Sequence, residues 1–232
     1  MRDLTVIIPA YDPDETLVGI VRELADDFPR ILVVDDGSDS GRNVFDAVRA
    51  LGATVLVHPQ NRGKGAALKT AFRHVLERLP EAAGAVTVDA DGQHLAKDVR
   101  RVAAAAEPGI LTLGARSFAG AVPFRSRLGN LWTRGEFRLL TGATVSDTQS
   151  GLRALPRELL EEALAVPGER YEYEIAALVA FAKRGCVKEL PITTVYAPGN
   201  PTSHYRPLAD TVRTQRALLT AAFPILRRLR RR

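Results

Sequence analysis

Short apolar runs alternate with amphipathic segments through the first half of the chain. The runs are continuously apolar, as is typical of strands buried on both faces of a sheet. The segments between them place apolar residues at helical spacing. This alternation predicts an α/β fold in which a mostly parallel sheet carries helices on both faces. The predicted strands are Leu4–Pro9, Ile31–Val34, Thr54–Val57, Ala85–Val88 and Ile110–Leu113, and the predicted helices are Glu15–Phe28, Asn43–Leu51, Ala66–Leu79 and Lys97–Ala106.

The pattern changes after the fifth predicted strand, where helical spacing becomes more common. Gly151–Leu155 is predicted to return to the sheet, and residues 198–207 are predicted to form a loop. Residues 208–232 begin with apolar positions at helical spacing. Because no repeat or low-complexity linker is visible, we predict one catalytic domain over residues 1–207 and an extension over 208–232. The other predicted elements are helices at Asn130–Thr141, Arg157–Ala165 and Glu172–Lys183 and a strand at Val187–Ile192.

The composition limits the class of protein and its location. A chain of 232 residues suits one α/β domain with a real core, and its apolar and charged fractions are ordinary for a soluble protein. The single cysteine, Cys186, rules out an internal disulfide framework and fits a reducing compartment. Neither a signal peptide nor an apolar run as long as a membrane span is visible, so a cytoplasmic protein is predicted.

The net charge of +5 is concentrated at the C-terminus, where the last six residues contain five arginines. The apolar segment Ala217–Leu226 comes just before them and is too short to span a bilayer. An apolar face beside a cluster of cations predicts a helix that lies on the anionic inner face of the cell membrane. A solvated tail is the alternative. Nucleic-acid binding is disfavoured because the aromatic platforms that it uses are missing.

Asp89 and Asp91 form the most informative acidic pair, and they follow the apolar run Ala85–Val88. Residues two apart on an extended segment point to the same side, where two carboxylates repel each other unless a cation lies between them. Gly92 allows a sharp turn, and Gln93 can offer a third oxygen. Oxygen ligands in this number predict a hard divalent cation. The alternative is an acidic turn with no ligand.

Two other predicted strands also end in polar clusters. Pro9 and Tyr11 close the first strand, and Asp35 with Asp36 follows the second. Since the carboxyl ends of parallel strands meet at one edge, we expect an acidic ligand-binding cleft there. Asp35 and Asp36 suit hydrogen bonds from a base or from ribose hydroxyls, or else form a turn that caps a helix. Lys64 opens the third helix and suits a nucleotide's phosphates or base edge, or else belongs to a solvated helix start.

Together these segments resemble the family 2 glycosyltransferases of the GT-A fold, which is a Rossmann-like fold. The segments that carry the resemblance are residues 6–11, 33–38, 61–66 and 88–94. Within that family, residues 146–153 are similar to the corresponding segment of bacterial polyprenyl-phosphate (dolichyl-phosphate) mannose and glucose synthases. The resemblance extends to residue 207. The combination of motifs is specific, although no single motif is.

The resemblance implies a nucleotide-sugar donor and a Mg²⁺ or Mn²⁺ ion that bridges its diphosphate. A nucleoside diphosphate gains negative charge as it leaves, and a metal ion stabilises that charge as a Lewis acid. The reaction needs no covalent intermediate, so we predict single displacement with inversion. The implied donor site places Asp35, Asp36 and Lys64 on the nucleotide, Pro9 and Tyr11 around the base, and Asp89, Asp91 and Gln93 around the metal, with Asp91 as a catalytic residue.

The resemblance also implies that Arg116 and Arg127 hold the phosphate of a lipid-linked acceptor. A guanidinium can bind phosphate oxygens through two parallel hydrogen bonds; ordinary surface arginines are the alternative. A phosphate is already an anionic nucleophile, whereas a sugar hydroxyl needs a general base. Asp147 is the best candidate for such a base, or else a structural carboxylate that holds the turn after it. Glu172 and Glu174 suit the positive end of a helix dipole, or else face the cleft.

Several alternatives stay open at this point. The acceptor can be a saccharide or protein hydroxyl instead of a polyprenyl phosphate. A sugar-nucleotidyltransferase shares a similar sheet, but residues 11–15 are acidic and poorly suited to a triphosphate. A non-catalytic nucleotide-sugar-binding protein is disfavoured by the intact acidic pairs. Relatives commonly carry Asn and Glu where residues 12–15 stand, which leaves a GDP-linked or a UDP-linked donor open, and the sequence predicts no oligomeric state.

Overall fold

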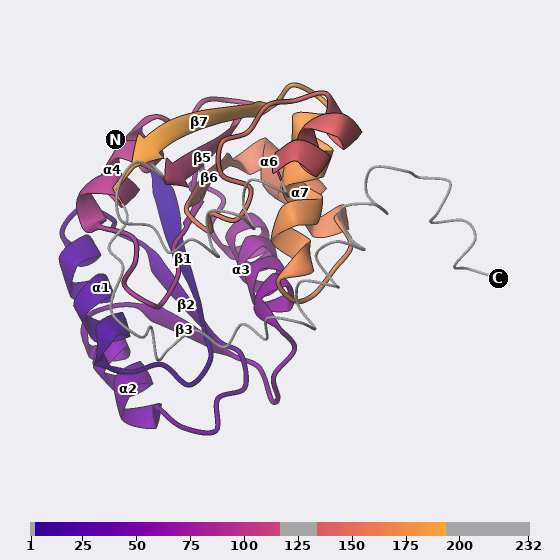
Figure 1. The fold of residues 1–232 in the computed structure, drawn as a ribbon. Helices are drawn as coiled ribbons and strands as arrows, with labels where there is room; N and C mark the ends of the chain where they lie inside the picture. Colours follow the sequence, from indigo (N-terminus) through magenta and orange to yellow (C-terminus); the bar gives the residue numbers. More distant parts are fainter. Residues whose placement is uncertain (1–2, 117–133, 194–232) are drawn as a thin grey trace.

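The computed structural model describes residues 3–116 and 134–193, and within them one seven-stranded sheet has the order β3-β2-β1-β4-β6-β5-β7 (Figure 1). The predicted α/β fold is therefore confirmed. The strands are β1 (Leu4–Ala10), β2 (Ile31–Asp35), β3 (Thr54–Val57), β4 (Gly84–Thr87), β5 (Leu111–Arg116), β6 (Arg153–Pro156) and β7 (Val187–Ile192). The helices with complete bounds are α1 (Glu15–Ala25), α2 (Arg42–Ala50), α3 (Lys64–Arg78), α4 (Ala96–Ala104), α6 (Arg157–Ala165) and α7 (Glu172–Ala182), and residues 134–141 are also helical.

One strand runs against all the others. β6 pairs antiparallel with both β4 and β5, whereas the remaining neighbours pair in parallel. The start of β6 therefore lies at the edge where β4 ends, with Arg153 opposite Thr87. This reversal brings the segment that precedes β6 to the edge of the sheet that holds the predicted ligand-binding residues.

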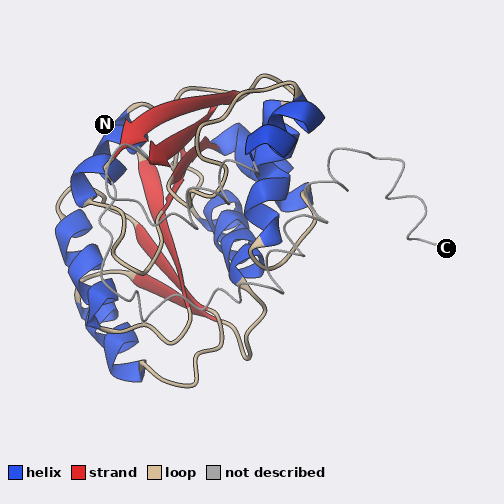
Figure 2. Cartoon of the chain, in the orientation of Figure 1, coloured by secondary structure: helices blue, strands red, loops and turns tan. Residues whose placement is uncertain are grey.

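Helices cover both faces of the sheet, and each face has its own apolar core (Figure 2). Along β1, Val6 and Ile8 pack into the core under α1, α2 and α4, whereas Ile7 packs into the core under α3, α6 and α7. All three residues are fully buried. The alternation follows from the two-residue period of a strand, and a strand that is apolar on both sides is typical of a sheet covered on both faces.

Some predicted features lie outside the described residues. These are Arg127, the loop over residues 198–207 and the basic extension over residues 208–232. Among the residues that the structure describes, no helix is both long enough and apolar enough to cross a membrane.

Arg157 at the start of α6 holds the end of α3. Its guanidinium donates to the carbonyls of Leu76 and Leu79, at 2.8 Å each, and makes longer contacts with those of Val75 and Ala82. Carbonyls in the last turn of a helix have few partners within the helix, and Arg157 adds charged hydrogen bonds to them. We expect Arg157→Ala to lower the free energy of unfolding by about 2 kcal/mol, since hydrogen bonds to a charged group are lost.

Urea denaturation measures this loss, and Arg49→Ala is the matched control. Arg49 makes an exposed ion pair with Asp46 within α2, and such pairs contribute less than about 1 kcal/mol. An Arg157→Ala variant that lost no more stability than Arg49→Ala would contradict the role of Arg157.

Candidate active site

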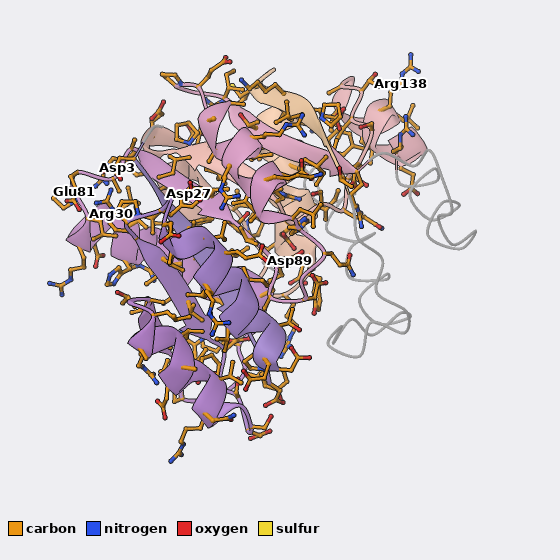
Figure 3. The ribbon with its side chains drawn as sticks, turned by 90° about the vertical axis from the view of Figure 1, so that its left-hand side faces the viewer. Asp3, Asp27, Arg30, Glu81, Asp89 and Arg138 are labelled. Atoms are coloured by element: carbon orange, nitrogen blue, oxygen red, sulfur yellow. The ribbon has the colours of Figure 1, made fainter. Side chains whose placement is uncertain are left out.

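Asp89 lies at the carboxyl edge of the sheet and is bound by two basic side chains. Its Oδ1 is 2.6 Å from Nζ of Lys64, and its Oδ2 is 3.4 Å from Nε2 of His94. Burial favours the neutral carboxyl group, but the charge of Lys64 and the contact with His94 outweigh it and hold the pKa of Asp89 well below its ordinary value. Figure 3 shows Asp89 far from the ion pairs of Arg30 with Asp3 and Glu81, which join the amino ends of β1, β2 and β4.

Lys64 joins Asp89 to a second carboxylate. Its Nζ also lies 2.7 Å from Oε2 of Glu174, in the first turn of α7. Burial disfavours the charged amine, but the two carboxylates outweigh it and raise the pKa of Lys64 above its ordinary value. The other oxygen of Glu174 is buried without a hydrogen-bond partner among the described residues. The acidic start of the predicted helix was the only sequence signal for Glu174. The sequence did not show whether Glu174 faces the cleft or only stabilises the helix dipole.

Asp91 lies in a turn, and Gln93 directly follows it. β4 ends at Thr87, and residues 90–92 form a turn, so the prediction of extended backbone through Asp91 is wrong. Oδ1 of Asp91 accepts a hydrogen bond from the amide of Gln93 at 3.0 Å, and both side chains are half-buried. Asp91 is therefore the less constrained carboxylate of the pair.

The oxygen ligands fit a divalent cation only in part. Within residues 3–116 and 134–193, no three His, Cys, Asp or Glu side chains are grouped so as to hold a metal ion by themselves. Asp89 is engaged by Lys64, which leaves Asp91 as the accessible carboxylate. Mg²⁺ commonly binds through one or two carboxylates together with substrate phosphates and water. The residues present fit that arrangement and do not form a complete protein cage.

A cavity of about 260 Å³ opens beside the end of β2. Asp35 lies in its wall, where its Oδ1 accepts a hydrogen bond from the amide of Ser38 at 2.9 Å. The loop after β1 is fixed to the same wall, because the amide of Asp12 donates to Oγ of Ser38 at 2.9 Å. The residues that line the cavity are Tyr11, Asp35, Gly37, Ser38, Asp39, Val57, His58, Pro59, Gln60 and Asn61.

Asp36 and Pro9 do not line this cavity. Asp36 is only 3% exposed, and its carboxylate accepts hydrogen bonds from the amides of Arg62 and Gly63 at 3.0 and 2.7 Å. It therefore fixes the segment that leads into α3, whereas the prediction placed it beside Asp35 on the nucleotide. Pro9 lies within β1, paired with Val34.

Asp147 and Arg116 form a buried ion pair. Nε and Nη2 of Arg116 donate to the two carboxylate oxygens of Asp147 at 2.6 and 2.9 Å, and Asp147 is fully buried. Burial acts to raise the pKa of Asp147, but the hydrogen bonds and charge of Arg116 outweigh it, so the pKa lies below its ordinary value. This environment suits a carboxylate that orients a guanidinium better than one that accepts a proton from a substrate.

The segment before β6 packs against Asp89. Oε1 of Glu189 accepts hydrogen bonds from the amide and hydroxyl of Ser146 at 2.7 and 2.9 Å. Thr87 donates to the carbonyl of Gly151 at 2.6 Å. A Cβ atom on Gly151 would lie only 2.5 Å from a carboxylate oxygen of Asp89, so a larger residue at position 151 would displace that carboxylate. Gly151 is thus the residue of this segment that lies directly against Asp89.

The family model described as Glycosyl transferase family 2 matches residues 5–164. The polyprenol monophosphomannose synthase of Mycolicibacterium smegmatis is 33% identical over 202 residues, which cover 81% of this chain and 76% of that protein. The UDP-N-acetylglucosamine–dolichyl-phosphate N-acetylglucosaminyltransferase of Methanococcus voltae is 30% identical over 223 residues, covering 82% of this chain and 85% of that one.

Solved structures match the fold. Glucosyl-3-phosphoglycerate synthase from Mycobacterium tuberculosis, crystallised with Mn²⁺, UDP and glucosyl-3-phosphoglycerate, superposes with a TM-score of 0.71 at 20% identity. The match covers 95% of this chain and 80% of that one. The extent of the family match and the identity to the two relatives settle the family. The chain belongs to glycosyl transferase family 2 and is a nucleotide-sugar-dependent glycosyltransferase similar to the polyprenyl-phosphate sugar transferases.

Proposed function

We propose that this protein transfers a hexose, of the mannose or glucose type, from a nucleotide sugar to a polyprenyl phosphate with inversion at the anomeric carbon. The observation that carries the proposal is the continuity of the site. Asn61 lines the cavity beside Asp35, and Lys64, three residues later, contacts Asp89. A nucleoside in the cavity would therefore direct its diphosphate towards Lys64 and the acidic turn, where the lysine favours an anion.

In this proposal Asp35 and Tyr11 contact the nucleoside, while Lys64 and Asp89 lie beside the diphosphate. Asp91, with Gln93, would hold a Mg²⁺ or Mn²⁺ ion, as in the DXD motif implied by the resemblance. When bound, such an ion stabilises the charge that develops on the leaving nucleoside diphosphate. Mn²⁺ and Mg²⁺ in solved structures of the same fold support this choice.

The acceptor side rests on Arg116 and Arg127. Asp147 holds the guanidinium of Arg116 in a fixed orientation at the end of β5, beside the acidic site. A polyprenyl phosphate attacks through its own anionic oxygen and needs no general base. The burial of Asp147 in an ion pair fits that acceptor better than a hydroxyl. The names of the relatives from Mycolicibacterium smegmatis and Methanococcus voltae point to the same class of acceptor.

A lipid acceptor also requires contact with a membrane surface. We propose that the basic extension over residues 208–232 supplies it, through its apolar positions and its cluster of arginines. The protein would then act at the inner face of the cell membrane. Deletion of residues 217–232 separates this role from catalysis, since it should weaken sedimentation with anionic liposomes and leave the binding of nucleotide unchanged.

A donor screen tests the reaction. The purified chain is incubated with polyprenyl phosphate and radiolabelled UDP- or GDP-linked glucose or mannose, with Mg²⁺ or Mn²⁺, and the lipid is then extracted. We expect label in the lipid phase with one of these donors, and a loss of at least about 100-fold when EDTA removes the metal. Label that appeared only in water-soluble saccharide would contradict the lipid-phosphate acceptor, and transfer unaffected by EDTA would contradict the metal.

A further inference from the structure

His58 is a buried residue to which the proposed reaction gives no role. It follows β3, is 5% exposed, and lies in the wall of the cavity beside Asp35. Nδ1 of His58 is 2.7 Å from a carboxylate oxygen of Asp36, and Nε2 is 2.9 Å from Oγ1 of Thr70. Both ring nitrogens are therefore engaged. A neutral imidazole satisfies both contacts when Nδ1 carries the hydrogen and Thr70 donates to Nε2.

These contacts hold α3 at two separate points. Asp36 accepts hydrogen bonds from the amides of Arg62 and Gly63, immediately before the helix. Thr70 lies in the second turn of the same helix. His58 lies between Asp36 and Thr70, so one imidazole links the end of β3, the end of β2 and two levels of α3. The first residue of that helix is Lys64, which contacts Asp89.

The same contacts draw together the two walls of the cavity. One wall is the segment over residues 35–39 after β2, and the other is the segment over residues 57–61 after β3. The amide of His58 donates to the carbonyl of Asp35 at 2.8 Å. Gly37, at φ +72°, lies so close to Gln60 that a Cβ atom there would be 2.2 Å from its carbonyl carbon. The width of the cavity therefore depends on how firmly these two segments are joined.

The sequence of contacts Thr70–His58–Asp36 also resembles the arrangement of a hydrolase triad. Two observations exclude a nucleophilic role in this fold. Asp36 is already bound by two backbone amides, and neither Thr70 nor Asp36 lines the cavity that His58 borders. A nucleophile needs an open approach for its substrate. A positioning role remains, and the position of His58 in the cavity wall favours it.

We propose that His58 and Thr70 are positioning residues for the donor nucleotide and act through Asp36 on the cavity walls and on the start of α3. The inference rests on the proposed function, because it assumes that the cavity takes the nucleoside of the donor. It predicts an effect on the binding of the nucleotide that is larger than the effect on turnover once the donor is saturating.

Titration calorimetry with UDP and with GDP, each in the presence of Mg²⁺, measures the effect directly. We expect His58→Ala to raise the Kd about tenfold for whichever nucleotide the unchanged chain binds. The donor KM should rise to match, and kcat should stay within about twofold of the original. His58→Asn places an amide nitrogen near the position of Nδ1 and should recover most of the affinity. Thr70→Val should weaken binding by about threefold, and Thr70→Ser should restore it.

Arg157→Ala is the matched control, because it loosens the opposite end of α3. It should lower the stability of the fold without changing the Kd. A Kd that is unchanged in both His58→Ala and Thr70→Val, or a fall in kcat without a change in Kd, would overturn the inference. If His58→Ala does not fold, Thr70→Val decides, because it removes a single hydroxyl.

The proposed function can fail separately from this inference. A chain that binds UDP or GDP, and loses affinity in His58→Ala, but transfers no sugar to polyprenyl phosphate would contradict only the acceptor. A chain that transfers sugar while His58→Ala and Thr70→Val bind normally would contradict only the positioning role. If the unchanged chain binds neither UDP nor GDP, the positioning role is overturned together with the assignment of the donor.

Discussion

Replacing Asp91 with asparagine is expected to abolish sugar transfer and to leave the fold intact. The carboxylate is half-buried, and the contact that the structure assigns to it is a hydrogen bond from the amide of Gln93. An asparagine carbonyl can still accept that bond, so little stability is lost. The negative charge that would hold the cation disappears. We expect kcat/KM to fall by at least about 100-fold, as when a group that stabilises a developing charge is removed.

A comparison with Asp89→Asn distinguishes the roles of the two carboxylates. Asp89 is held by Lys64 and His94, so loss of its charge leaves Lys64 with Glu174 alone and weakens a charged hydrogen bond at a half-buried carboxylate. We expect this variant to lose activity and also about 2 kcal/mol of unfolding free energy, whereas Asp91→Asn should lose only activity.

Initial rates of transfer, calorimetric titration with Mn²⁺, and thermal melts give the three measurements needed. Asp46→Asn, which changes an exposed carboxylate on α2, is the control for a simple change of charge. Near-normal transfer by Asp91→Asn at limiting Mn²⁺ would show that Asp91 does not hold the metal. Equal losses of stability in Asp89→Asn and Asp91→Asn would contradict the distinction between the two side chains.

The fold was predictable to a large extent because its information is local. Apolar runs and helical spacing marked the described strands and helices to within a few residues of their bounds. The direction of β6 was not predictable, because the residue types in a strand of four residues do not show which way it runs.

The cavity proposed to bind the donor is lined by some of the predicted residues, but the contacts around it were not predicted. Asp35 and Asp36 are adjacent in sequence, and adjacent residues near a strand end point to opposite sides. That alternation was an available signal that only one of them faces the cavity. The link from Lys64 to Glu174 joins residues that are distant in the sequence, so it depends on how α3 and α7 pack, which no local pattern contains.

The role of Asp147 depends in the same way on its surroundings. The sequence around a carboxylate in a polar turn does not show whether that carboxylate accepts a proton or pairs with a cationic side chain. Its complete burial against Arg116 makes the difference. For Arg116, the predicted role at the acceptor phosphate came from the resemblance to polyprenyl-phosphate transferases. That Asp147 orients its planar guanidinium became visible only in the structure.

If Arg116 binds the acceptor as proposed, Asp147→Asn should weaken acceptor binding more than it slows the chemical step. Asparagine can accept one of the two bonds from Arg116 but carries no charge, so the guanidinium loses its fixed orientation. We expect the KM for polyprenyl phosphate to rise at least about tenfold while kcat stays within about threefold. A general base would behave differently, because its removal lowers kcat by about 100-fold or more and abolishes the acidic limb of the pH–rate profile.

The difference in unfolding free energy between the unchanged chain and Asp147→Asn should also depend on pH. Arg116 outweighs burial and holds the pKa of Asp147 below its ordinary value of 3.8, so the ionised carboxylate stabilises the folded chain at neutral pH. A depressed pKa gives stability that is present above the ordinary value and is lost as the pH falls through the folded value. The difference in unfolding free energy between the original chain and Asp147→Asn should thus be full at pH 7 and shrink below about pH 4. A stability difference that grew as the pH fell would contradict the ion pair with Arg116. A kcat that fell with KM unchanged would indicate that Asp147 is a general base and that the acceptor is a hydroxyl.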